Sequence, residues 1–98
     1  MEKTMAQNKT AQIEKKYFLG MAFPKYNHPA KLYDETNINE INNIKSSSGG
    51  TSYYIGYFQN NRLIRFEKYL HNEKIMEFNY FYDEKDNMIK YIKNIPKK

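Results

Sequence analysis

The sequence predicts an α+β fold, an antiparallel β-meander sheet of about four to six strands with one short helix packed on one face. The main observation is a strand-turn-strand pattern that occurs twice, because Tyr57–Leu70 is echoed 25 positions later by Tyr82–Ile95. The echo aligns residues of the same class: Leu63 with Met88, Ile64 with Ile89, Arg65 with Lys90, Phe66 with Tyr91, Lys68 with Lys93 and Leu70 with Ile95. A second observation, a single isoleucine stripe at helical spacing, predicts the helix.

The first half of the 98-residue chain predicts two short strands and that helix. Residues 1–14 are polar and aperiodic, so we expect a disordered lead-in followed by one α+β domain over 15–98. The apolar run 16–23 predicts a strand that stops at Pro24, and 31–33 predicts a second strand. Asn37 is the expected N-cap, with Glu40 in the capping-box position. The helical stripe consists of Ile38, Ile41 and Ile44, and 46–50 ends it.

The turns of the second half set an expected strand register. Asn60 and Asn61 suit a two-residue turn, because asparagine tolerates positive φ. That turn would place Tyr57 opposite Ile64, and a three-residue loop over 72–74 would place Phe66 opposite Tyr80. A loop drawn from 84–87 would then pair Tyr82 with Ile89 and Tyr80 with Tyr91.

Strict alternation in this register divides the side chains between two faces. The predicted core face, which the helix should cover, holds Ile55, Tyr57, Ile64, Phe66, Leu70, Met76, Phe78, Tyr80, Tyr82, Ile89, Tyr91 and Ile95. The opposite face mixes aromatic, apolar and charged residues: Tyr54, Phe58, Leu63, Arg65, Glu67, Tyr69, Glu77, Asn79, Phe81, Asp83, Met88, Lys90 and Ile92. Such a mixture is typical of a protein interface.

Composition limits the chemistry that we expect. The chain has no cysteine, so disulfides and thiolate metal sites are excluded. His28 and His71 are predicted in loops without a second ligand at metal spacing, so no metal or other cofactor is expected. Two of Glu67, Glu77 and Asp83 could form an acid/base pair, with Glu67 predicted diagonal to Glu77, but ordinary pairing with Arg65 and Lys68 explains these carboxylates. We therefore expect no enzyme activity.

Location and charge point to a protein partner. No signal peptide or membrane-length apolar run is seen, so a cytoplasmic protein without membrane association is expected. The formal net charge is +5, yet 53–95 contain seven cations against six carboxylates, which argues against a dedicated nucleic-acid face. The residues predicted to contact a protein partner are Tyr54, Phe58, Arg65, Glu67, Tyr69, Glu77, Phe81 and Lys90.

Other interpretations remain open at this point. The mixed face could instead be covered by the N-terminal strand or by a second copy in a homodimer, or cross-strand charge pairs could keep it solvated. A single-stranded nucleic-acid binder is the first alternative function, with Tyr54, Phe58, Tyr69 and Phe81 stacking bases while Arg65 and Lys90 meet phosphates. A small ligand-binding α+β domain with a pocket between helix and sheet is the second.

Tyr80-Phe81-Tyr82-Asp83-Glu84-Lys85-Asp86-Asn87-Met88 resembles the repeat unit of YD (Rhs-type) proteins. The segment 57–63 resembles it less closely, with Phe58 at the aspartate position, and Asn61 and Asp86 stand where the family turn normally has glycine. Small bacterial domains with YD- or MORN-like hairpins resemble immunity proteins and antitoxins. The resemblance implies an inhibitor that neutralises a cognate toxin, such as a type VI or Rhs effector, by steric occlusion.

Overall fold

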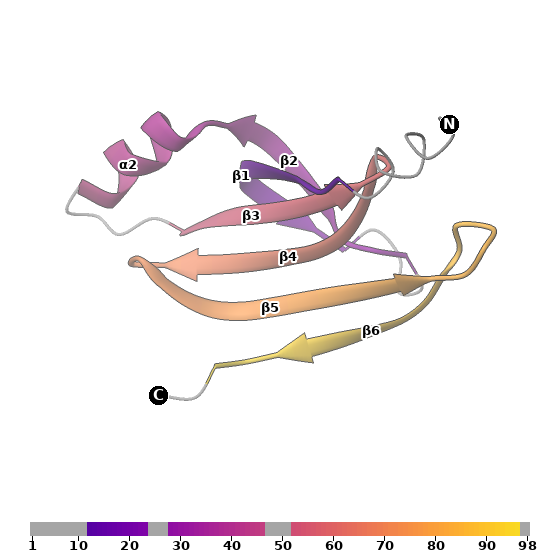
Figure 1. Cartoon of the computed structure of the whole chain (residues 1–98). Coiled ribbons are helices and arrows are strands. Elements are labelled where there is room, and N and C mark those ends of the chain that lie inside the picture. Colours follow the sequence, from indigo (N-terminus) through magenta and orange to yellow (C-terminus); the bar gives the residue numbers. More distant parts are fainter. Residues whose placement is uncertain (1–11, 24–27, 47–51, 97–98) are drawn as a thin grey trace.

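A computed structural model describes residues 12–23, 28–46 and 52–96, and shows one six-stranded antiparallel sheet with a single short helix (Figure 1). The strand order is β2-β1-β3-β4-β5-β6, so β3 to β6 form the expected meander. The elements are β1 (Glu14–Ala22), β2 (Lys31–Thr36), α2 (Ile38–Ser46), β3 (Ser52–Gln59), β4 (Arg62–Leu70), β5 (Glu73–Tyr82) and β6 (Met88–Asn94). The predicted antiparallel sheet is confirmed. Most of the predicted lead-in lies outside the described residues, and Glu14 already belongs to β1.

Two of the hairpin turns consist of two residues with positive φ. Asn60 and Asn61 have φ of 55° and 63°, which confirms the predicted turn. His71 and Asn72 have φ of 51° and 66° and connect β4 to β5. The predicted loop over 72–74 is therefore wrong, because two consecutive residues in the left-handed region already reverse the chain with the twist that a hairpin needs.

Each hairpin of the meander contains one β-bulge, and in each case the extra residue is an isoleucine. Phe58 pairs with Leu63 but Tyr57 pairs with Arg65, which leaves Ile64 as the extra residue. The same count identifies Ile75 between β4 and β5, and Ile89 between β5 and β6. A bulge shifts the register by one residue, so most of the predicted pairs are wrong, although Tyr80 does pair with Tyr91.

The bulges redistribute the side chains between the two faces. One face, which we call the aromatic face, holds a buried cluster that includes Tyr54, Leu63, Phe66, Phe78 and Tyr80, with Phe58 and Met88 packed against it. The other, which we call the charged face, holds Arg65, Glu67 and Glu77 together with Tyr53, Ile55, Tyr57 and Tyr69. The prediction that Tyr54, Phe58, Leu63 and Met88 share a face with Arg65 is wrong, as is the placement of Ile55 and Tyr57 beside Phe66.

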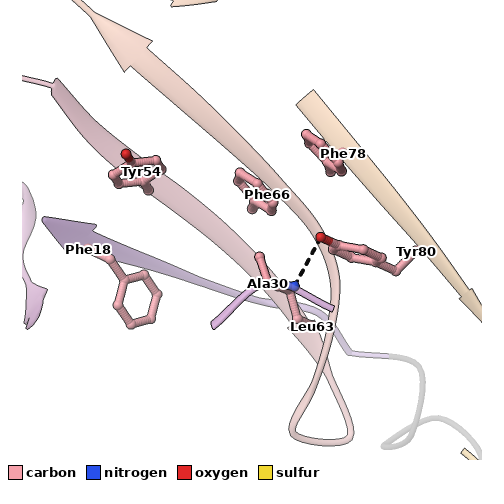
Figure 2. Close-up of a cluster of buried hydrophobic side chains, with 7 residues drawn as sticks. All are labelled: Phe18, Ala30, Tyr54, Leu63, Phe66, Phe78 and Tyr80. Carbon is pink, nitrogen blue, oxygen red and sulfur yellow. Dashed lines mark hydrogen bonds between the residues drawn. The ribbon is translucent and has the colours of Figure 1, made fainter. Parts of the chain in front are cut away.

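The β1–β2 end of the sheet bends behind β3 (Figure 1), and Figure 2 shows the side chains that are buried on the aromatic face. Phe66 stacks on Phe78 with ring centroids 5.0 Å apart, and Phe23, just after β1, lies 5.5 Å from Phe78. The Ala30 N–H donates to the Tyr80 hydroxyl at 3.0 Å. Because β3 and β4 separate β1 from β5 in the sheet, these contacts require strong curvature.

A glycine creates room for that curvature. A Cβ placed on Gly56 would lie only 2.6 Å from Leu32 Cδ1, so a side chain here would have to displace the end of the Leu32 side chain on β2. Gly56 pairs with Phe66, and the missing side chain lets the aromatic cluster and β2 approach one another.

The helix packs on the charged-face side at the end of β3 where that strand begins (Figure 1). The Glu40 N–H donates to Asn37 Oδ1 at 2.9 Å, which confirms the predicted N-cap. Ile41 is fully buried against Tyr53 and Ile55, whereas Ile38 is exposed. The expectation that the helix covers the face of Phe66 is wrong, because the curled β1–β2 end of the sheet occupies that position. Among the described residues, no helix has the length and apolar character to span a membrane.

Candidate functional site

Glu67 is the centre of a hydrogen-bonded network on the charged face. Its side chain is buried, with 3% of the residue exposed, and its Oε1 accepts from the hydroxyls of Tyr57 at 3.2 Å and Tyr69 at 3.1 Å. Its Oε2 accepts from Arg65 Nη2 at 2.8 Å and from Lys74 Nζ at 3.5 Å. A buried carboxylate is tolerated here because both oxygens are satisfied by donors, two of which carry charge.

Glu77 lies directly opposite Glu67 on the neighbouring strand, rather than diagonally as predicted. Lys74 Nζ donates to its Oε1 at 2.7 Å, and Arg65 Nη2 does so at 3.3 Å. Asn79 Nδ2 donates to the other oxygen at 2.9 Å. Two carboxylates are thus held together by two cations, and the second cation is Lys74 rather than the predicted Lys68, whose ammonium lies over the Tyr54 ring.

The pKa values show which charge states this network favours. The hydrogen bond from Lys74, followed by that from Asn79, lowers the pKa of Glu77 to about 2. Burial alone would raise the pKa of Glu67, but hydrogen bonds from Arg65 and Tyr69 and the charge of Lys74 lower it. Burial and then the Glu67 charge raise the pKa of Tyr69. Both carboxylates are therefore ionised and both cations charged at neutral pH, so neither carboxyl group has a proton to donate.

The β5–β6 hairpin, which we call the second hairpin, repeats the cation–ring pair of the β3–β4 hairpin, the first hairpin, but has Ile92 where the first has Glu67. In the first, the Arg65 guanidinium carbon lies 5.1 Å from the Tyr57 ring, and in the second, Lys90 Nζ lies 5.1 Å from the Phe81 ring. Tyr57 pairs with Arg65 as Phe81 pairs with Lys90, so Phe81 is the structural counterpart of Tyr57. The sequence echo aligned Tyr57 with Tyr82 instead, because the loop between β5 and β6 is longer and shifts the first strand by one residue.

Ile92 stands at the position that Glu67 has in the first hairpin. It pairs with Asn79 and is 43% exposed, while Phe81 is 41% exposed. Lys90 is also exposed and pairs with Phe81. We call Phe81, Lys90 and Ile92 the edge patch, since it lies on β5 and β6 where the sheet ends (Figure 1).

The predicted contact residues fall into three groups. Tyr54 and Phe58 belong to the aromatic face, where Tyr54 is buried. Arg65, Glu67, Tyr69 and Glu77 satisfy one another in the Glu67 network. Phe81 and Lys90 are exposed and adjacent. The sequence did not indicate Lys74, because it was assigned to a loop. It did not indicate Ile92 either, because an apolar residue at the position equivalent to Glu67 gives no polar signal.

An open pocket of about 750 Å³ lies beside the Asn60–Asn61 turn and the loop between β5 and β6. Its cation, Arg62, forms an ion pair with Asp86 and lies 4.6 Å from the Tyr82 ring. The pocket does not lie between helix and sheet, where a ligand site was considered. No group of three or more potential metal ligands occurs in the described part of the chain.

Comparison of the chain with protein-family models, with curated proteins and with solved structures finds no match to any of them.

Proposed function

We propose that the chain is a protein-binding inhibitor, an immunity protein that neutralises a secreted bacterial toxin in the cytoplasm by steric occlusion. The edge patch carries this proposal. Phe81 and Ile92 expose apolar surface on the sheet and lie beside Lys90, and an exposed apolar patch rimmed by charge is one mark of a protein interface.

The other residues of the charged face lie beside the edge patch and stabilise the strands that carry it. Arg65 and Glu67 on β4 form ion pairs with Glu77 and Lys74 on β5, and these pairs help to hold the two strands in fixed register. In this α+β fold the helix packs through Ile41 at the distant end of β3. The contact surface would thus be preorganised, which reduces the entropy lost on binding.

The geometry counts against the nucleic-acid alternative. Base stacking would need Tyr54, Phe58, Tyr69 and Phe81 on one surface, yet Tyr54 and Phe58 lie on the aromatic face. Tyr69 donates its hydroxyl to Glu67, so a carboxylate lies beside any phosphate that approached Arg65. An acid/base enzyme is also disfavoured, because both carboxylates of the network have lowered pKa values.

Co-expression tests the proposal. The product of the gene immediately upstream would be expressed in cells with and without this chain, and surviving colonies counted. We expect the upstream product to be toxic and the chain to restore survival. A harmless upstream product, or toxicity that the chain does not relieve, would contradict the proposed function.

A matched pair of variants tests the edge patch. Phe81→Ala should reduce rescue, whereas Leu19→Ala removes an apolar side chain of similar exposure (42%) from β1 and should leave it intact. Equal rescue by both variants would remove the patch from the interface without contradicting the inhibitor function.

A further inference from the structure

The first hairpin shows what a strand added beside β6 would have to supply. Beside β4, strand β5 contributes the Glu77 carboxylate, 3.3 Å from Arg65 Nη2, on the charged face. On the aromatic face it contributes Phe78, stacked on Phe66 at 5.0 Å with only 6° between the ring planes. On each face of the sheet, β5 thus supplies a side chain that contacts one on β4.

The second hairpin has groups equivalent to those that β5 contacts on β4. In the described structure, however, no strand lies beside β6 to contact them. Lys90 corresponds to Arg65, and Tyr91, which is 51% exposed, corresponds to Phe66. β6 is the last strand of the sheet, so alternate backbone N–H and C=O groups along it face away from β5. It contains two lysines, Lys90 and Lys93, and no acidic residue.

We infer that β6 binds an extended, acidic segment of a partner protein by antiparallel or parallel strand addition. In this complex a carboxylate of the segment pairs with Lys90 on the charged face. An aromatic side chain of the segment packs on Tyr91 on the opposite face. Main-chain hydrogen bonds supply affinity, and the alternating side chains supply selectivity. The inference rests on the proposed function only in taking the partner to be a protein.

The charges favour a different protein over a second copy of this chain. Pairing β6 with β6 of another copy would bring four lysines to one seam with no carboxylate from either strand, and like charges across strands are destabilising. The other edge of the sheet is unsuited to an acidic segment, because β2 contains Asp34 and Glu35. Asp34 also has φ of 60°, which interrupts an extended edge.

Binding of designed peptides to the full chain tests the inference. The probe is a ten-residue peptide in which Thr and Val flank a central Glu-Phe-Glu, and the control carries Lys-Phe-Lys at the same positions. We expect the acidic peptide to shift backbone amide NMR signals of β6 and leave those of β2 unchanged. The lysine peptide should bind at least about tenfold more weakly. Lys90→Glu should reverse this preference, while Lys31→Glu on β2 should not.

A pair of proline variants tests strand addition itself. Along β6 the N–H direction alternates, so of Tyr91→Pro and Ile92→Pro one removes an outward N–H and the other an N–H of the β5 ladder. The variant with the higher thermal midpoint is the outward one, and it should bind the acidic peptide at least about tenfold more weakly. Unchanged affinity in that variant, equal shifts at β2, or a dimer of β6 edges in sedimentation would overturn the inference.

The toxin rescue assay separates this inference from the proposed function. If the outward proline variant still rescues cells, strand addition is wrong and the inhibitor function stands. If the wild-type chain does not rescue but the acidic peptide binds β6, the inhibitor function is wrong and the edge site stands.

Discussion

The two copies of the bulged hairpin differ mainly in what lies beside them. Both have an extra isoleucine in the second strand and a cation over an aromatic ring on the charged face. The first copy is flanked by β5 and contains Glu67, which is buried, whereas the second ends the sheet and has Ile92 in that position. One local pattern thus becomes core where a neighbouring strand covers it and accessible surface where none does.

The largest expected contrast is between the two equivalent aromatic residues. Phe66→Ala removes a fully buried ring that stacks on Phe78, so it should lower the free energy of unfolding by about 3–5 kcal/mol. Tyr91→Ala removes a half-exposed ring and should cost about 1 kcal/mol. Urea denaturation of both variants measures the difference, and similar losses would show that the second copy is as much a part of the core as the first.

A smaller contrast is expected between Glu67 and Ile92. Glu67→Ala leaves two tyrosine hydroxyls and two cations without their shared acceptor, and should cost about 2–3 kcal/mol. Ile92→Ala should cost less than about 1 kcal/mol, because the side chain is exposed. Chemical denaturation in low and high salt would check this, and a Glu67→Ala variant as stable as the wild type would mean that the network is dispensable.

The pH dependence of stability should also distinguish the copies, by at most about 3 kcal/mol. The pKa of Glu77 is about 2 in the folded chain against an ordinary value of 4.5, so its contribution is fully present above pH 4.5. That contribution is lost as the pH falls towards 2, where the folded-state carboxylate takes up its proton. Glu77→Gln should flatten the stability profile in this window. Lys90→Met, in the second copy, should leave it unchanged, and a parallel profile for Glu77→Gln and wild type would contradict the assignment.

The sequence was sufficient for the strands, the Asn37 cap and the Asn60–Asn61 turn, because each depends on local chemistry. It was not sufficient to assign each side chain to the correct face of the sheet. A bulge residue such as Ile64 is as hydrophobic as a regular strand residue, so the alternation of side chains between the two faces gives no sign of the bulge. The echo did not reveal the error either, since Ile89 is a bulge residue at the equivalent position and both copies are displaced together.

The same one-residue shift of register affected the predicted contact residues. Arg65, Glu67, Tyr69 and Glu77 were correctly grouped because they lie beyond the first bulge and alternate regularly among themselves. Tyr54 and Phe58 were assigned to them across the bulge and therefore to the wrong face. That Glu67 would be buried could not be predicted, because its exposure depends on Tyr57 and Tyr69, whose positions follow from the observed register.

The strand order also has a consequence for how the chain reaches its folded state. The pairs within β3–β6 join strands that are adjacent in sequence, whereas β1 must find β3 across β2 and the helix, for example Phe18 opposite Tyr54. Closing that longer loop costs more chain entropy, so we expect the meander to form first and the β1–β2 end to dock last over Phe66 and Phe78. Pulsed hydrogen exchange during refolding should show protection in β5 before β1. Simultaneous protection would indicate that closure of the sheet and formation of the hairpins are one event.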